Sequence, residues 1–230
     1  MTRRGRAAGL GDLQEAIKET AWRQVAEFGA AALSLRAIAR ELGITAPAIY
    51  NYFARRDDLI TALIIDAYSS LGDSQLAARD ALPPEDLVGR MMATGLAYRQ
   101  WALAHPQHYQ LIFGTPLPDY AAPEERVFPA GARSLRALVS VMEALRLSGR
   151  LLTPGFPLPA LPDAAAFDKW KKFGGETDVL SLSVAVLIWS QVHGLVSLEI
   201  AGSLPPFGLS GEQLYQLELD LICRQFIRDA

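Results

Sequence analysis

The chain has 230 residues and a formal net charge of −3, and 50% of its residues are hydrophobic while 20% are charged. This composition is typical of a globular protein long enough to bury a core and to hold a small domain beside a larger one. A single cysteine, Cys223, excludes an internal disulfide and favours a reducing, cytoplasmic compartment. The N-terminal residues show no apolar run like a secretory signal, and we find no repeat or low-complexity tract.

The chain begins with a basic tail and an amphipathic helix. Residues 1–6 hold three arginines without apolar periodicity, so we expect a mobile tail, either a functional basic arm or a solubilising terminus. Residues 12–28 predict a helix, because apolar residues recur along them at helical steps. A capping-box pattern at Asp12 and Glu15 marks its start, and Gly29 marks its end.

Residues 34–56 predict two short helices joined by a tight turn. The first follows Ser34, whose hydroxyl can accept hydrogen bonds from the amides of the first turn, and its apolar residues fall on one face. Gly43 supplies the backbone freedom for a sharp stop, and Thr45 is again a good N-cap. Pro47 fits the first turn of the second helix, where its missing N–H costs nothing.

The outward side of this helix pair is basic. Between Arg36 and Arg56 the only acidic residue is Glu41, within a chain whose net charge is negative. Local basicity in an acidic protein indicates a polyanion site. The alternative is a plain packing unit, since helix pairs of this kind also occur without nucleic acid. The outward and framing residues are Arg36, Arg40, Thr45, Ala46, Ala48, Tyr50, Asn51, Arg55 and Arg56.

This stretch resembles the DNA-binding domain of the TetR family of bacterial transcription regulators. The shared pattern is Ser34, the pair Ile38 and Ala39, Gly43, the segment 50–53 (YNYF) and Arg56, in the order and spacing of the family signature. The resemblance implies a helix-turn-helix that binds double-stranded operator DNA, and a homodimer. Four positions depart from the usual residue types and bear on the operator sequence, namely Ala37, Ala46, Asn51 and Arg56.

We assign two roles within this motif, here called the reading head (residues 34–56). Phosphate contacts set affinity and its salt dependence, and we expect them from Tyr50, Asn51 and Arg56. Arg36 matches a family position that can reach guanine, and small side chains of the second helix could meet thymine methyls. The residues expected to face base edges are Arg36, Thr45, Ala46, Pro47 and Ala48. The full predicted DNA-binding set is Ser34, Arg36, Thr45, Ala46, Pro47, Ala48, Tyr50, Asn51, Arg55 and Arg56.

The predicted domain border lies at the end of this motif. We expect residues 1–56 to form the helix-turn-helix domain and residues 57–230 to form a helical effector-binding and dimerisation domain. The basic N-terminal arm is either a functional arm that touches phosphate or the minor groove, or a solubilising terminus. Residues 1–58 carry nine basic and seven acidic side chains, and the remainder carries 13 and 18, a polarity that helps to orient the protein on a duplex. The sequence predicts a helix from residue 57 to about Gly72. The family resemblance implies that this helix is the mechanical link between the two domains.

Helical patterns continue through the middle of the chain. We expect helices over residues 84–104, 107–113 and 122–149, the first of them opened by Pro84. Four prolines between residues 151 and 175 exclude a continuous helix there. We therefore expect a connecting loop with at most a short turn, whose lysines form a solvated patch.

The last two helices, over residues 177–201 and 210–228, have more apolar surface than one partner requires. The first could be mistaken for a membrane span, but polar residues such as Ser181, Gln191 and Glu199 would be costly in hydrocarbon. A helix that is apolar nearly all round is instead buried in protein. Two such helices per chain can build a four-helix bundle across a two-fold axis, which predicts a homodimer without membrane contact.

The larger domain carries a narrower resemblance. Trp189, His193 and Gly194 in WSQVHGL, with the earlier HPQHY segment, look like the TetR subgroup whose C-terminal domain is named WHG. Aromatic walls with a few polar groups suit an unknown small, partly apolar effector. For His193 a structural role as a buried imidazole near the dimer seam stays open. The predicted effector-binding residues are Tyr98, Trp101, His105, Tyr109, Phe113, Trp189 and His193.

Catalytic and metal chemistry have little support in the sequence. It lacks the HExxH, paired CxxC, GxxxxGK and GxSxG patterns. His105 and His108 are three residues apart, but Pro106 lies between them and no cysteine or dense carboxylate partner is near, so we expect no metal. Cys223 is interpreted as a small apolar residue. No cofactor and no enzymatic activity are expected.

The sequence therefore predicts a cytoplasmic regulator of all-α fold, most simply a repressor that a small molecule releases from its operator. Two alternatives stay open. One is a ligand-binding or enzymatic protein that does not regulate genes, which a gel shift on its own upstream region would separate. The other is a protein-interaction module that uses the apolar C-terminal helices, and a clean dimer mass would count against it.

Overall fold

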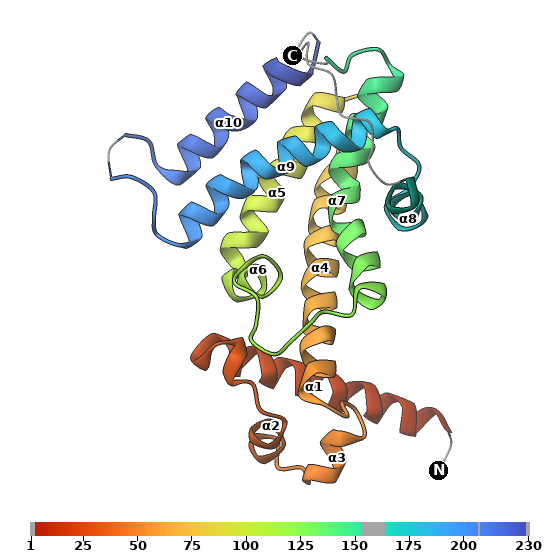
Figure 1. The fold of residues 1–230 in the computed structure, drawn as a ribbon, viewed down its shortest axis with the longest axis vertical. Helices are drawn as coiled ribbons and strands as arrows, with labels where there is room; N and C mark the ends of the chain where they lie inside the picture. Colours follow the sequence, from red (N-terminus) through yellow and green to blue (C-terminus); the bar gives the residue numbers. More distant parts are fainter. Residues whose placement is uncertain (1–2, 153–163, 207, 229–230) are drawn as a thin grey trace. The chain divides into compact units, whose positions relative to one another are not determined.

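The computed structural model describes residues 3–152, 164–206 and 208–228, and most of them are helical (Figure 1). Within these ranges, β pairing is limited to an isolated antiparallel bridge between Leu151 and Ile227. The expected all-α fold is confirmed. The elements are α1 (Arg3–Phe28), η1 (Ala30–Ala32), α2 (Leu35–Glu41), α3 (Ala46–Tyr50), α4 (Arg56–Asp80), α5 (Leu87–Ala104), α6 (Pro106–Phe113), α7 (Glu124–Leu147), α8 (Ala164–Gly174), α9 (Val179–Ile200) and α10 (Gly211–Phe226).

The chain divides into two compact units. Unit 1 comprises Met1–Ala67 and Gln107–Val127, and unit 2 comprises Tyr68–Pro106 and Phe128–Ala230. Helix α4 therefore contributes to both units, and almost all of α6 belongs to unit 1 although it directly follows α5. The border predicted after residue 56 does not coincide with this division. That border stays a prediction of where the DNA-binding part ends and the effector-binding part begins.

Unit 1 has a small core to which each of the first four helices contributes. Ile17 of α1, Ile38 of α2, Ile49 of α3 and Leu59 of α4 are fully buried. Each helix presents one apolar stripe, because its apolar residues recur at helical spacing. Burial of these residues positions the two short helices of the reading head against α1 and α4.

Helix α1 begins at Arg3, nine residues before the predicted start at Asp12. The predicted mobile tail is therefore wrong from Arg3 to Arg6, while Met1 and Thr2 lie outside the described residues. Arginine, alanine and leucine make up most of residues 3–10, and all three are good helix formers. They carry the helix past the capping-box pattern at Asp12.

Helix α4 runs to Asp80 rather than ending near Gly72. Within unit 2, a Cβ placed on Gly72 would lie 3.1 Å from the Cα of Ser134 and 3.3 Å from the carbonyl oxygen of Arg133, both on α7. The glycine permits close packing of two helices instead of ending one of them. An ion pair between Arg133 and Asp73 fastens the same contact.

Helix α5 begins three residues after the predicted start at Pro84. The side chain of Asp86 caps it by accepting a hydrogen bond from the Gly89 N–H at 2.9 Å. A carboxylate satisfies the free amides of a first turn, so the cap defines the start more strongly than the proline does. Helix α7 begins at Glu124, close to the prediction, and continues through Pro129 at the loss of one backbone hydrogen bond.

The predicted loop over residues 151–175 is wrong in its second half, where Ala164–Gly174 form α8. Its proline-rich first half, residues 153–163, lies outside the described residues. After the last proline no helix breaker follows until Gly174, so the chain is free to form a helix. All three lysines of the expected solvated patch lie over aromatic rings, with Nζ to ring-centre distances of 4.6 Å for Lys169, 5.0 Å for Lys171 and 5.2 Å for Lys172.

Helices α9 and α10 pack against each other and against α5 in unit 2 (Figure 1). The capping box predicted at Ser210 and Gln213 is present with both of its hydrogen bonds. Arg99 of α5 donates two hydrogen bonds, of 2.8 and 2.6 Å, to the carboxylate of Glu199 on α9. The buried Tyr215 of α10 donates to an α5 carbonyl at 2.7 Å. These contacts fix the last two helices to the rest of unit 2.

Helix α9 is long and apolar enough to cross a membrane by length and composition alone. Its most apolar window has a mean hydropathy of 1.8, and 33% of that window is buried within the structure. The expected burial on every face is therefore incomplete within one chain. Exposed apolar side chains remain on both α9 and α10, and we call them the C-terminal apolar set: Val186, Leu187, Leu198, Leu217 and Leu221.

Glu143 of α7 anchors the start of α9, and this predicts a loss of stability in acid. Its carboxylate accepts hydrogen bonds from Arg146 and, at 3.0 Å, from the Asp178 N–H. Hydrogen bonding to Arg146, aided by the Asp178 amide, lowers the pKa of Glu143 from 4.5 to about 2. A carboxyl whose pKa is lower in the folded state stabilises the fold above about pH 4.5, and that contribution is lost as the pH falls towards 2.

We expect Glu143→Gln to lower the free energy of unfolding by about 2 kcal/mol at pH 7, after allowance for screening by solvent. The difference from the unsubstituted protein should shrink between pH 4.5 and pH 3, as measured by urea unfolding. Glu85→Gln, at an exposed position of unit 2, is the matched control and should stay close to the unsubstituted protein throughout. A stability difference that does not change with pH would contradict the assigned role of the carboxylate.

Candidate nucleic-acid interface

Hydrogen bonds at the N-terminus of α2 fix this helix to α1. The hydroxyl of Ser34 accepts from the Ala37 N–H at 3.3 Å, which confirms its predicted role as the N-cap. The N–H of Ser34 itself donates to the side-chain oxygen of Gln24 at 3.3 Å. Because Gln24 is a buried residue of α1, the start of α2 is held at a defined place on that helix.

The turn between α2 and α3 has the geometry that the sequence predicts. Gly43 has a φ of 65°, in the left-handed region that glycine adopts without strain. The Ile44 N–H donates to the Ala39 carbonyl at 2.9 Å and closes the end of α2. The hydroxyl of Thr45 accepts from the Ala48 N–H at 3.4 Å and caps α3. The two helices thus form a helix-turn-helix.

The predicted DNA-facing side of α3 is open to solvent within unit 1. Ile49 and Phe53 are buried and anchor the opposite side of the helix. Small side chains on the open side leave room for close approach to a groove edge. Of the predicted set, Arg36, Thr45, Ala46, Pro47, Tyr50, Asn51 and Arg55 are exposed, and Ser34, Ala48 and Arg56 are half-buried.

Five residues of the predicted set line one hollow at the start of α2, which we call the arginine hollow. Its volume is about 360 Å³, and its other lining residues are Leu33 and Leu35. With three arginines and two hydroxyl-bearing residues in its lining, the hollow suits DNA, because arginine binds both phosphate and guanine edges through paired N–H donors. The five predicted residues are Ser34, Arg36, Tyr50, Arg55 and Arg56.

Arg56 also has a structural role that the sequence analysis missed. Its guanidinium donates to the carbonyl oxygens of Ala30 at 3.0 Å, Ala31 at 2.9 Å and Leu33 at 3.2 Å. These bonds join the first residue of α4 to the segment that leads into α2. The sequence signal was an arginine where the family usually has lysine, since only the forked guanidinium can reach several acceptors at once.

A second missed residue is Arg23 of α1. It donates to the carboxylate of Glu41 at 2.8 Å, and Glu41 is the only acid between Arg36 and Arg56. The pair offsets the charge of this acid at the end of α2. A lone acid within a basic motif was the available signal, but the sequence alone did not identify its partner, which lies 18 positions away.

Three of the predicted effector residues form one cluster in unit 2. The hydroxyl of Tyr98 on α5 lies 2.8 Å from Nδ1 of His193 on α9, and the ring of Trp189 lies 4.9 Å from the imidazole ring. Tyr98 is almost fully buried. Burial lowers the pKa of His193, so its imidazole is neutral at pH 7. The hydrogen bond at Nδ1 joins a neutral imidazole and a phenol, and Nε2 of the same ring lies 3.4 Å from the Ser197 hydroxyl.

The other four predicted effector residues belong to the end of α5 and to α6. Trp101 and His105 are near the end of α5, with ring centres 5.6 Å apart, and the Trp101 indole N–H donates to the Ser70 hydroxyl at 2.9 Å. Tyr109 and Phe113 are in α6 and belong to unit 1, with ring centres 5.1 Å apart. The description of these seven residues as one lining stays a prediction.

Comparison with known proteins identifies the two parts of the chain. A family model described as bacterial regulatory proteins, tetR family, matches residues 17–63. A second, described as tetracyclin repressor-like, C-terminal domain, matches residues 91–222, more than half of the chain. The HTH-type transcriptional regulator Rv1816 of Mycobacterium tuberculosis is 36% identical over 193 residues, which are 83% of this chain and 81% of the relative.

Solved structures agree with this result. The crystal structure of the regulatory protein SCO4313 has a TM-score of 0.75 and 34% sequence identity, and the match covers 96% of this chain and 98% of that chain. A protein of unknown function from Rhodococcus sp. RHA1 has a TM-score of 0.71 at 22% identity, covering 94% and 96%, and this likeness shows the fold alone. The chain belongs to the TetR family of DNA-binding transcription regulators, which are not enzymes.

Proposed function

We propose that this regulator is a cytoplasmic homodimeric repressor that binds two half-sites of an operator and is released by a small, partly apolar molecule. The observation that carries the DNA contact is the arginine hollow beside the open side of α3. Arg36 and Arg55 are exposed and line this hollow together with Tyr50 of α3, and Ala46 and Pro47 are exposed on the same helix as Tyr50. A positively charged hollow suits the phosphate backbone, and small side chains suit the groove.

A gel shift with the DNA upstream of the protein's own gene tests the proposed function. Affinity should fall steeply as salt rises from 50 to 200 mM, because phosphate contacts release counterions. Transcription from the same DNA should rise when the effector is added, as expected for a repressor. Absence of a sequence-specific shift would favour a ligand-binding or interaction module instead.

The assignment of base and phosphate contacts predicts different behaviour for two substitutions. Arg36→Ala should weaken operator binding by about 5- to 100-fold and relax base preference at one position. Tyr50→Phe removes only a hydroxyl and should weaken binding to every sequence by about fivefold. Binding to an operator and to scrambled DNA, measured by fluorescence anisotropy, separates the two. Equal behaviour of both variants on both DNAs would contradict the assignment.

The effector proposal rests on the cluster of Tyr98, Trp189 and His193. An aromatic ring beside a neutral imidazole and a phenol offers an apolar surface with two hydrogen-bonding groups. One solved structure of similar fold, at 14% identity and a TM-score of 0.62, is a complex of SmeT with triclosan. For the present chain the proposal of a small, mostly apolar ligand and no cofactor rests on the cluster itself.

The dimer proposal rests on the C-terminal apolar set. Its five side chains are exposed on helices that pack against each other and against α5 within unit 2. A second copy of the chain would cover them, and a two-fold axis would place two reading heads for half-sites about one DNA turn, roughly 34 Å, apart. Burial against a second copy, rather than in lipid, also fits the polar residues of α9.

A further inference from the structure

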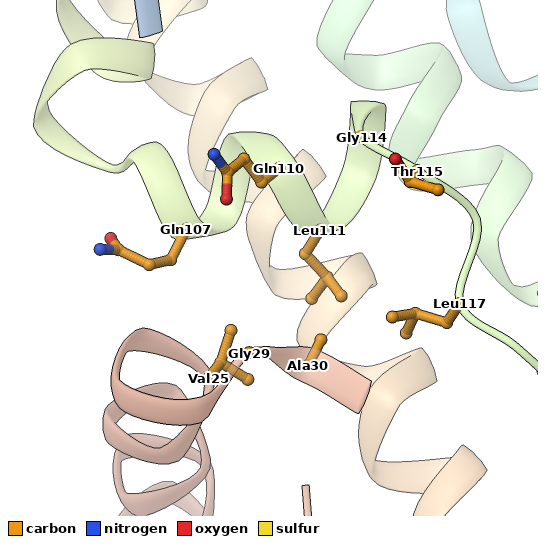
Figure 2. Close-up of a pocket in the computed structure, with 9 residues that line it drawn as sticks. All are labelled: Val25, Gly29, Ala30, Gln107, Gln110, Leu111, Gly114, Thr115 and Leu117. Atoms are coloured by element: carbon orange, nitrogen blue, oxygen red, sulfur yellow. The ribbon is translucent and has the colours of Figure 1, made fainter. Parts of the chain in front are cut away.

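Unit 1 contains a cavity of about 410 Å³ that the proposed function does not use (Figure 2). One wall is the end of α1 with the turn that follows it, and the opposite wall is α6 with the segment after it. Figure 2 shows Leu111 and Leu117 extending from the α6 side toward Val25 and Ala30. The lining residues are Val25, Gly29, Ala30, Gln107, Gln110, Leu111, Gly114, Thr115 and Leu117.

The chemistry of this lining selects an uncharged ligand. None of the nine lining residues carries a charge. A charged ligand would lose its hydration here without gaining a counter-charge from the lining, which is costly. Gln107, Gln110 and Thr115 instead offer amide and hydroxyl groups beside the leucine and valine side chains. This combination suits a small molecule with an apolar body and a carbonyl, amide or hydroxyl group.

The wall on the α1 side leads directly into the reading head. Ala30 lines the cavity, and its carbonyl oxygen accepts a hydrogen bond from Arg56 at 3.0 Å. The next residues of this segment lead to Ser34, the cap of α2. A ligand that contacts Gly29 and Ala30 therefore contacts the segment that positions α2. The same segment continues into Leu33 and Ser34, which line the arginine hollow.

The wall on the α6 side is also tied to the helices of unit 1. The imidazole of His108 stacks on the indole of Trp22 of α1, with ring centres 3.6 Å apart and an interplanar angle of 16°. Beyond the cavity, the Tyr120 hydroxyl lies 3.0 Å from the Thr61 hydroxyl of α4. Such contacts hold both walls in place. We therefore expect a bound molecule to change how the two walls pack against each other.

We propose that this cavity, whose lining includes no residue of the Tyr98 cluster, is a binding site for a small uncharged molecule, and that its occupancy changes the affinity of the reading head for DNA. The second half of the proposal rests on the proposed function, because its readout is operator binding. Coupling of this kind is reciprocal, so operator DNA must change the affinity of the ligand by the same factor.

The binding half is tested on the full-length protein with benzamide as the probe. NMR amide signals of Gly29, Ala30, Gly114 and Thr115 should shift saturably, with half-saturation near millimolar concentration, as expected for a fragment of this size. Benzoate and benzylamine, of similar size but charged, should produce no saturable shift at these positions. Shifts confined to unit 2, or equal responses to the charged probes, would overturn the site.

A cavity-filling variant with a matched control locates the probe. Leu111→Trp places an indole in the cavity and should abolish the benzamide response, while Ala122→Trp adds the same group at an exposed position and should preserve it. The amide spectrum of each variant shows whether it is folded. If Leu111→Trp is unfolded, Thr115→Val, which removes only the hydroxyl, should weaken benzamide binding severalfold instead. Unchanged binding by folded Leu111→Trp would overturn the site.

The regulatory half is tested by operator affinity with and without saturating benzamide. We expect a change of at least threefold, matched by the same change in benzamide affinity when operator is present, and no change with Leu111→Trp. Saturable binding that leaves operator affinity unchanged would overturn the regulatory role. Failure to bind any operator would contradict the proposed function and with it this role, whereas the NMR result decides the binding site independently.

Discussion

Arg56→Leu is expected to lower the free energy of unfolding by about 3 kcal/mol and operator affinity by about 30-fold or more. The guanidinium of Arg56 donates to the carbonyls of Ala30, Ala31 and Leu33 over distances of 2.9 to 3.2 Å. Leucine would remove all three bonds and would release the segment that leads into α2. Urea unfolding and a gel shift measure the two effects.

Two further variants separate this structural role from the phosphate contact predicted for Arg56. Arg55→Leu removes a neighbouring arginine whose side chain is 74% exposed, so it should weaken DNA binding without a large loss of stability. Arg56→Lys keeps the positive charge but lacks the forked donor geometry. If the hydrogen bonds to the three carbonyls are the main contribution of Arg56 to stability, Arg56→Lys should have a free energy of unfolding close to that of Arg56→Leu. Full recovery of stability by lysine would contradict the structural role.

Local signals predicted the parts of the fold that residues within one turn determine. Ser34, Thr45 and Ser210 each cap a helix by accepting from an amide three residues away, and all three caps are present. The turn at Gly43 depends on its own backbone freedom. Such features are readable from sequence because donor, acceptor and spacing lie in one short stretch.

Contacts between distant positions produced the errors. Gly72 looked like a helix end, yet it provides close packing with Ser134, which is 62 positions away in the chain. Arg56 looked like a phosphate ligand alone, yet its carbonyl partners lie 23 to 26 positions earlier. Periodicity and capping rules carry no information about such pairs, so the sequence could not assign these residues their packing roles.

The predicted effector residues also depend on contacts between distant positions. Tyr98 and His193 are 95 positions apart, and no local pattern links them. The structure brings these two together with Trp189, but it assigns Tyr109 and Phe113 to unit 1. The α6 segment therefore contributes to the unit that contains the reading head. The cavity beside α6 could not be predicted, because Val25 and Leu111 meet only in the folded chain.

The double substitution Leu217→Glu and Leu221→Glu is expected to convert the protein into a folded monomer. These leucines of α10 are 47% and 48% exposed in the single chain, so two carboxylates there cost the monomer little. In a dimer the same carboxylates would be buried without partners at the seam, which is strongly unfavourable. Sedimentation at micromolar concentration measures the mass, and circular dichroism shows whether the helices are intact.

Loss of the dimer should reduce operator affinity by about 100-fold or more, because a linked second reading head binds at high effective concentration. Leu103→Glu with Leu147→Glu is the matched control, since both are exposed leucines of unit 2 outside α9 and α10. This control should remain dimeric and bind the operator. A variant of α10 that stays dimeric would place the subunit seam elsewhere, and a monomer with unchanged operator affinity would mean that one reading head is sufficient.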